Sequence, residues 1–285
     1  MAPAPTPARN PAAPLDLDRV AALRRADLLT MIHLAKSGHV GGSLSSVDIL
    51  TALYYDVLDV RPDEPRWPGR DRFVLSKGHS VEGLLCILAD RGFFPRAELA
   101  TYCRYGSRLI GHPSVKVPGI ELCTGALGHG LPAGVGMALG AKRTGQTWRT
   151  YVLMGDGEQA EGSVWEAAMA AAAHKLDNLV GILDRNRLQI SGPTEQVMPL
   201  ENLADKWRAF GWEVVRVNGH DIPALIAALR GAPCRPGAPT LVLADTTKGR
   251  GVKLMENAVK WHHGVPSKEQ LAEALADLGV GEVSF

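Results

Sequence analysis

Five short apolar runs that alternate with helix-like stretches are the feature of this sequence that most constrains its fold. The runs are Phe73–Leu75, Tyr151–Met154, Leu179–Leu183, Val214–Val217 and Leu241–Leu243. The spacing of apolar residues predicts helices near 80–91, 131–143, 163–175, 200–210 and 221–230. Strands that are separated by helices and are almost entirely apolar favour a parallel sheet covered on both faces. We therefore predict an α/β protein with three α/β/α layers and a central, mainly parallel sheet.

The residues ahead of the first strand are predicted to form a tail and two helices. Residues 1–14 are rich in Ala and Pro and lack the apolar core of a signal peptide, which predicts a disordered tail. Asp16 and Asp18 are suited to cap a helix that ends near the Gly-rich stretch 37–42, and a second helix is predicted from Ser46. Residues 15–285 contain no repeat or long linker, which favours one domain.

Charge and cysteine usage exclude several classes of function. The 31 Lys and Arg residues nearly balance the 30 Asp and Glu residues, which argues against nucleic acid or an anionic membrane as a partner. No apolar run approaches the roughly 18 residues of a membrane span. The four cysteines, which form no C-x-x-C pair, are predicted to be reduced thiols: Cys86, Cys103, Cys123 and Cys234. These features predict a cytoplasmic protein.

The candidate site lies in the loops that follow the predicted strands, because ligands of open α/β sheets bind at the carboxyl ends of the strands. Gly155-Asp156-Gly157 allows close backbone approach to a ligand, although the same tripeptide is also typical of a plain turn. Asn186 follows the next strand of the pattern, so its side chain and that of Asp156 are expected at one edge of the sheet. An Asp carboxylate, an Asn carbonyl and a backbone carbonyl suit Mg²⁺, which usually also binds phosphate oxygens.

This pattern resembles the thiamine diphosphate motif, and GDGEQAEGSVWEAAMAAAAHKLDNLVGILDRNRLQISG at 155–192 is similar to its transketolase form. Further stretches have transketolase counterparts in the same order: SGHVGGSLS (37–45), DRFVLSKGHS (71–80), GHP (111–113), TGALGHGLPAGVGMALG (124–140), GWEVVRVNGHD (211–221) and KGRGV…HHGVP (248–266). The resemblance covers about residues 16–275 and implies the thiamine-diphosphate-binding fold.

The resemblance also implies the ligands of the metal and the cofactor. The predicted ligands of Mg²⁺ (or Ca²⁺) are the side chains of Asp156 and Asn186 and the carbonyl of Leu188. The Gly157 amide, His79 and His263 would contact the diphosphate. Gly125 and Leu127 would present backbone groups to the aminopyrimidine, and Ile190 would pack against the cofactor.

One acidic group and four imidazoles are candidates for catalysis. His39 and His112 would line the channel and bind substrate hydroxyls or a developing oxyanion, and Glu161 would join a carboxylate network that links paired active sites. His79 and His263 belong to the same group, since histidine changes charge near neutrality.

Three positions keep alternatives open. His262 competes with His263 for the H-G-x-P position, and we assign His263. Lys77 is suited to touch phosphate but is equally typical of a solvated loop. His129 stands where many transketolases carry Gln.

The similarity stops where the pyrimidine-binding half of a full transketolase would begin. It therefore implies the diphosphate-binding subunit of a two-component transketolase, in an α2β2 heterotetramer with homodimer contacts and a separate C-terminal-half subunit. Such a complex transfers a two-carbon ketol unit from a ketose phosphate to an acceptor. One alternative is delivery of a glycolyl unit to a carrier protein in secondary metabolism, and another is a non-catalytic, thiamine-diphosphate-binding regulatory module. A decarboxylating α-ketoacid enzyme shares the GDG…N pattern, but the SGH, SKGH and GHP histidines favour transketolase.

Overall fold

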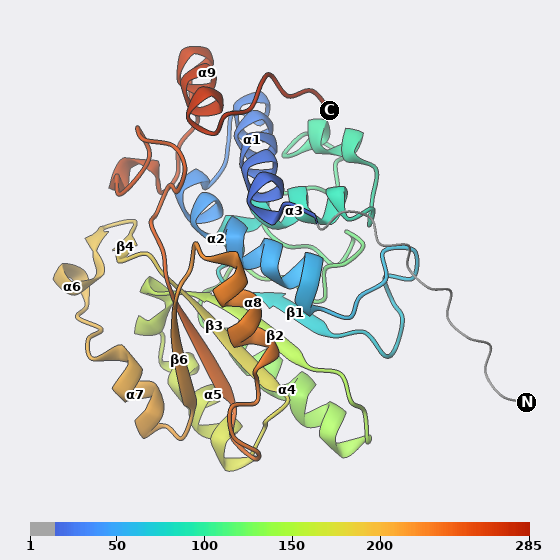
Figure 1. Ribbon diagram of the computed structural model, residues 1–285, viewed down its shortest axis with the longest axis vertical. Helices are drawn as coiled ribbons and strands as arrows, with labels where there is room; N and C mark the ends of the chain where they lie inside the picture. Colours follow the sequence, from blue (N-terminus) through green and yellow to red (C-terminus); the bar gives the residue numbers. More distant parts are fainter. Residues whose placement is uncertain (1–14) are drawn as a thin grey trace, which may run out of the picture.

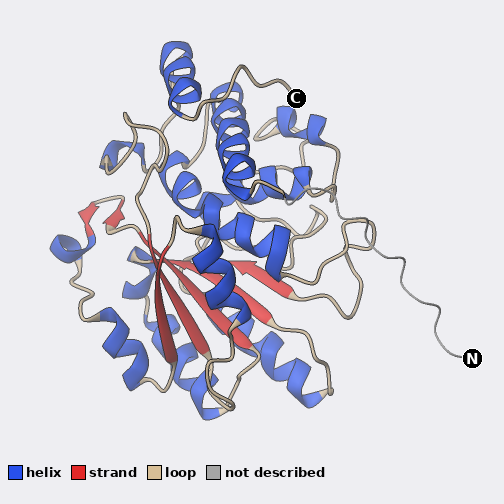
Figure 2. Ribbon diagram, in the orientation of Figure 1, coloured by secondary structure: helices blue, strands red, loops and turns tan. Residues whose placement is uncertain are grey.

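The central sheet consists of five parallel strands in the order β1-β2-β3-β7-β6 (Figures 1 and 2). The structure is a computed structural model that describes residues 15–285, so the tail predicted at 1–14 lies outside the described residues. The strands are β1 (Arg72–Leu75), β2 (Thr150–Gly155), β3 (Leu179–Arg185), β6 (Glu213–Asn218) and β7 (Thr240–Asp245). Every neighbouring pair is parallel, and all five predicted strands are confirmed.

Helices cover both faces of this sheet, which confirms the three-layer arrangement (Figure 1). The helices on one side are α1 (Leu17–Ala35), α2 (Val40–Ala52), α3 (Val81–Asp90) and α8 (Ile222–Arg230). Those on the other side are α4 (Gly130–Arg143), α5 (Gly162–Ala173) and α7 (Leu203–Ala209). None of the helices in the part of the chain from residue 15 onward is both long and apolar enough to span a bilayer.

Alternate residues of each strand enter two separate hydrophobic cores. Tyr151 and Leu153 of β2 pack in the core beneath α2, α3 and α8, whereas Val152 and Met154 pack in the core formed with α4, α5 and α7. Each of these four side chains is at most 1% exposed. A strand that is buried on both faces needs apolar residues at every position, which explains the continuous apolar runs in the sequence.

The second helix begins earlier than predicted. The sequence predicts a start at Ser46, but α2 begins at Val40 and includes Gly41 and Gly42 in its first turn. A Cβ atom on Gly41 would lie 2.7 Å from the Trp261 carbonyl oxygen, and one on Gly42 would lie 2.5 Å from Ser80 Oγ. The glycines therefore permit close packing of two loops against the helix rather than ending it. The first helix is confirmed, with Asp16 as N-cap.

Two features of the fold are absent from the predicted pattern. Helix α9 (Lys268–Asp277) is capped by a reciprocal pair of bonds between Ser267 and Gln270. After β3 the chain forms a two-stranded hairpin, β4 (Leu188–Gln189) and β5 (Gly192–Pro193), which leads into the short helix α6 (Thr194–Val197).

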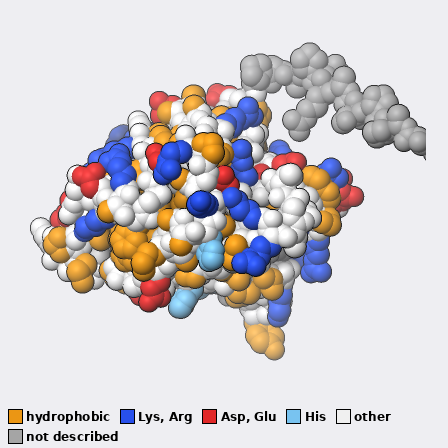
Figure 3. Space-filling model, turned by 90° about the horizontal axis from the view of Figure 1, so that it is seen from below, with side chains coloured by type: hydrophobic (Ala, Val, Ile, Leu, Met, Phe, Trp, Pro, Cys, Tyr) orange, Lys and Arg blue, Asp and Glu red, His pale blue; other side chains and the backbone are white. Residues whose placement is uncertain are grey.

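Charged groups of both signs share the surface. Seen from below, basic and acidic side chains are interspersed with hydrophobic ones on the visible face (Figure 3). This distribution is consistent with the formal net charge of +1.

Substitution of Gly41 tests the close packing of α2. We expect Gly41→Ala to lower the free energy of unfolding by about 1–3 kcal/mol, because the added methyl group meets a backbone carbonyl. Gly140→Ala is the matched control: it lies in α4 with no atom within 4 Å of the added Cβ, and we expect a gain of roughly 0.5–1 kcal/mol. Urea denaturation measures both. Equal effects at the two positions would contradict the packing argument.

Candidate active site

Four strands that are neighbours in the sheet end in polar loops, and these loops meet at one edge of the sheet. These strands are β1, β2, β3 and β7, and their carboxyl ends converge beside the β4 hairpin (Figure 1). Gly155 of β2 lies directly opposite Asp184 of β3, so the loops that carry Asp156 and Asn186 are neighbours, as predicted. A cavity of about 160 Å³ opens among these loops. Its walls contain seven predicted site residues: His79, Leu127, Asp156, Gly157, Asn186, Leu188 and Ile190.

The three predicted metal ligands share this cavity. The Asp156 carboxylate, 2% exposed, accepts hydrogen bonds from the backbone amides of Gly157 (2.8 Å) and Arg187 (2.5 Å). Burial raises its pKa. The Asn186 side-chain oxygen accepts a bond from the Leu188 amide at 3.1 Å. Carboxylate, amide and backbone oxygens form a hard donor set of the kind that Mg²⁺ prefers.

A positive charge already lies at one of these oxygens. Lys248 follows β7, and its Nζ donates to the Leu188 carbonyl at 2.8 Å and lies 3.0 Å from His262 Nδ1. The residue is 2% exposed, and burial together with the charge of Lys77 lowers its pKa to about 8. The Leu188 carbonyl is thus placed to bind a cation, so the residues present fit the metal that the resemblance implies.

Lys77 is buried rather than solvated. It forms an ion pair with Asp184 at the end of β3 and donates to the Gly42 carbonyl at 2.8 Å. Asp184 is completely buried, and burial alone would raise its pKa. The charge of Lys77 and hydrogen bonds from Lys77, Thr246 and Ser45 outweigh that effect and lower the pKa.

Five histidines gather beside the cavity. The His39 ring lies 5.2 Å from that of His79, 4.7 Å from His263, 5.8 Å from His262 and 6.3 Å from His112, measured between centroids. His79 and His262 are stacked at 5.3 Å. Both candidates at 262–263 therefore enter the cluster: His262 lines the cavity, and His263 contacts the ring of His39.

Burial keeps three of these imidazoles neutral. It is the largest cause that lowers the pKa of His79 to about 2, that of His262 to about 3 and that of His39 to about 4. Neighbouring positive charges act in the same direction, chiefly Lys77 at His79 and Lys248 at His262. A neutral imidazole has one donor and one acceptor nitrogen, which suits it to orient hydroxyl groups.

Of the other predicted residues, Gly125 and Glu161 are not part of the cavity wall, whereas Ile190 is an exposed part of it. A Cβ atom on Gly125 would lie 2.8 Å from His112 Cδ2, so this glycine allows the 124–128 loop to approach the histidines. Glu161 is exposed at the N-cap of α5. Ile190 lines the cavity but is 66% exposed.

Sequence reasoning missed Lys248, Asp184 and Glu158. Glu158 is 2% exposed and accepts hydrogen bonds from the amides of Gly128 (2.8 Å) and Gly155 (3.0 Å), which ties the 124–128 loop to the loop after β2. Lys248 follows the apolar run at 241–243, just as the predicted site loops follow the strands at 72–75, 151–154 and 179–183. The position of Lys248 in the loop after a predicted strand could therefore have identified it as a site residue.

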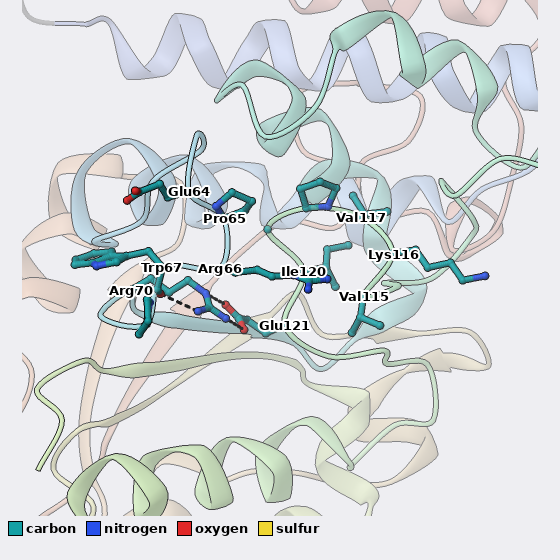
Figure 4. A pocket seen from close by; sticks show the side chains of 13 residues that line it. Glu64, Pro65, Arg66, Trp67, Arg70, Val115, Lys116, Val117, Ile120 and Glu121 are labelled. Atoms are coloured by element: carbon teal, nitrogen blue, oxygen red, sulfur yellow. Dashed lines mark hydrogen bonds and ion pairs between the residues drawn. The ribbon is translucent and has the colours of Figure 1, made fainter. Parts of the chain in front are cut away.

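A larger hollow, of about 690 Å³, lies elsewhere (Figure 4). It opens between the turn before β1 and the segment 115–121, and the described residues that line it include none of the predicted site residues. Arg70 and Glu121 form a double hydrogen-bonded ion pair in it, with both distances 2.6 Å. Because seven predicted site residues line the smaller cavity at the carboxyl ends of the strands, that cavity is the better candidate.

The fold and cavity define a class of protein: a three-layer α/β protein with buried charges of both signs at the carboxyl edge of its sheet. Comparison with known proteins identifies the family. The family model described as "Transketolase, thiamine diphosphate binding domain" matches residues 17–285. Because it contains this domain, the chain belongs to the transketolase family, whose members are transferases.

The chain is similar to separate subunits of transketolases and also to one part of longer transketolases. One of the subunits of the apulose-4-phosphate transketolase of Phocaeicola vulgatus is 53% identical over 254 residues, which cover 89% of this chain and 90% of that protein. A 6-deoxy-6-sulfo-D-fructose transketolase subunit of a Clostridium species is 41% identical and covered to 96%. Human transketolase is 40% identical over 85% of this chain, but the match spans 38% of its own length.

Solved structures agree with this assignment. Transketolase from Leishmania mexicana superposes with a TM-score of 0.89 at 30% identity, over 95% of this chain and 42% of that chain. The Campylobacter jejuni transketolase gives a TM-score of 0.88 at 32% identity and is covered to 44%. The chain therefore spans less than half the length of these transketolases.

The buried histidines predict how stability depends on pH. The unfolded chain binds protons on His39, His79 and His262 below pH 6.5, whereas the folded chain keeps them neutral down to about pH 4 or lower. The free energy of unfolding should therefore fall as the pH drops through this window, by up to about 1.4 kcal/mol per pH unit for each histidine.

Urea denaturation at several pH values measures this dependence. His79→Gln should make it shallower, whereas His174→Gln, at the exposed end of α5, should leave it unchanged. An unchanged pH dependence in His79→Gln would contradict the assignment of a neutral buried imidazole.

Proposed function

We propose that this chain is the thiamine-diphosphate- and Mg²⁺-binding subunit of a two-component transketolase. It acts with a separate C-terminal-half subunit to transfer a two-carbon ketol unit from a ketose phosphate to an acceptor. The observation that carries the proposal is the convergence of the Asp156, Asn186 and Leu188 oxygens in one cavity, beside two buried lysines. Relatives matched along nearly their whole length are themselves named as subunits of a transketolase, which supports a separate partner.

The metal would be held by the Asp156 and Asn186 side chains and the Leu188 carbonyl. The diphosphate would accept hydrogen bonds from the Gly157 amide and from His79, with His263 close by. The positive charges of Lys77 and Lys248 lie in the same wall of the cavity and offset the negative charge of the diphosphate. The Gly125 and Leu127 backbone would face the aminopyrimidine, and the exposed Ile190 would be covered by the cofactor.

Thiamine diphosphate, when bound, supplies the carbanion chemistry that breaks and forms carbon–carbon bonds. The chain itself contributes the binding groups and a cluster of histidines. His39 and His112 would bind substrate hydroxyls, because His39 is held neutral and both rings lie within the cluster. Glu161, exposed at the start of α5, would join the carboxylate network between paired sites.

The names of relatives favour a sugar substrate. Two of them are named for apulose 4-phosphate and for 6-deoxy-6-sulfo-D-fructose, which supports an anionic sugar, such as a sugar phosphate, over a carrier protein. We further propose an α2β2 assembly in the cytoplasm, in which residues 15–285 form one domain and residues 1–14 a tail.

The isolated full-length chain should bind thiamine diphosphate with Mg²⁺ but show little or no turnover. The partner subunit is expected to supply the remaining half of the active site. Isothermal titration measures binding, and a coupled assay with ketose phosphates, with and without the partner, measures activity. Substantial transketolase activity from the chain alone would sink the two-component proposal.

Asp156→Ala should weaken metal-dependent thiamine diphosphate binding by at least about tenfold, because it removes a charged metal ligand. Asp205→Ala, on the exposed surface of α7, is the matched control and should bind like wild type. Survival of full activity in a reconstituted Asp156→Ala complex would instead favour the non-catalytic regulatory module.

A further inference from the structure

A buried chain of polar side chains lies behind the active site and outside the cavity wall. Arg25 of α1 donates to Asp48 of α2, with 2.6 Å between Nη2 and Oδ2. The same carboxylate oxygen lies 2.6 Å from Nδ1 of His220, in the turn after β6. The three side chains are 7–9% exposed, so water does not compete effectively for these bonds.

The other ring nitrogen of His220 defines the proton arrangement. The backbone N–H of Thr247 donates to His220 Nε2 at 2.8 Å. Nε2 must therefore be unprotonated, which leaves the proton on Nδ1, where it is donated to Asp48. Arg25 offsets the charge of Asp48 from the other side.

Thr247 immediately precedes Lys248, whose ammonium group lies in the cavity. The same loop is held by the Thr246 amide, which donates to the Arg185 carbonyl at 3.1 Å, and by the Gly249 amide, which donates to the Gly41 carbonyl at 3.1 Å. The bond from Thr247 to His220 sets the peptide plane between these anchors. The bond therefore restrains the backbone one peptide ahead of Lys248.

We propose that His220 is a positioning residue: its Nε2 holds Thr247 and so directs Lys248 into the cofactor cavity. Arg25 and Asp48 keep the imidazole in the tautomer that accepts this bond. The inference rests on the proposed function, because it requires that the cavity bind a diphosphate.

Two amide substitutions separate the two bonds of His220. The side-chain amide of Gln reaches the position of Nε2 and can accept from Thr247, whereas the amide of Asn reaches the position of Nδ1 and can donate to Asp48. His220→Asn should weaken thiamine diphosphate binding by about tenfold, and His220→Gln by no more than about threefold. Each variant keeps one buried bond, so their melting temperatures should fall by similar amounts.

A double-mutant cycle tests whether the effect passes through Lys248. Thiamine diphosphate with Mg²⁺ is titrated into the full chain, reconstituted with its partner subunit, as wild type, His220→Asn, Lys248→Met and the double variant. The loss caused by His220→Asn should disappear when Lys248 is already replaced. A loss of equal size in the Lys248→Met background would overturn the proposal, as would equal losses of affinity in His220→Asn and His220→Gln.

Wild-type binding distinguishes this inference from the proposed function. Absence of thiamine diphosphate binding by the wild-type complex would refute the proposed function itself. Normal binding by the wild-type complex, together with either of the two contradicting outcomes of the variants, would refute the role of His220 alone. Should His220→Asn fail to fold, Asp48→Ala provides the same cycle, because it removes the acceptor that keeps the proton on Nδ1. Its loss of affinity should likewise vanish in the Lys248→Met background.

Discussion

The ion pair between Lys77 and Asp184 is the interaction on which the candidate site depends. Asp184 is the residue before the last of the central strand β3 and is completely buried, so its charge must be matched within the protein. Besides Lys77, from the loop after β1, it accepts bonds from Ser45 of α2 (2.7 Å) and from Thr246 after β7. One carboxylate thus joins the helix that follows His39, the loop that carries His79 and the loop that carries Lys248.

Around this pair, the cavity is built to hold opposite charges close together. Lys77 and Lys248 are positive, Asp156 and Asp184 supply negative oxygens, and all four side chains are nearly inaccessible to water. Electrostatic interactions are stronger in such surroundings than in bulk solvent, so a metal ion and a diphosphate bound as proposed would gain from groups that are already oriented. This local arrangement needs no overall positive charge, in keeping with a formal net charge of +1.

Much of the fold could be predicted because burial dictates composition. The five strands, the parallel pairing and most helices follow from apolar runs and helical spacing, as β2 and α8 illustrate. The start of α2 could not be predicted, because Gly41 and Gly42 are typical of a helix end and only their contacts with Trp261 and Ser80 explain their place in a helix. Helix α9 had a readable signal in the Ser267 and Gln270 capping pair.

By itself, the sequence determined the parallel sheet, the edge at which the loops meet and the placement of Asp156 and Asn186 at that edge. Each of these follows from the alternation of strands and helices along the chain. Tertiary structure alone decided which charges are buried. Lys77 and Lys248 look like ordinary loop lysines in the sequence, yet each is 2% exposed. The neutral state of His39, His79 and His262 was decided in the same way. Burial and the distance between charges depend on segments that are far apart in the chain, and no local pattern records them.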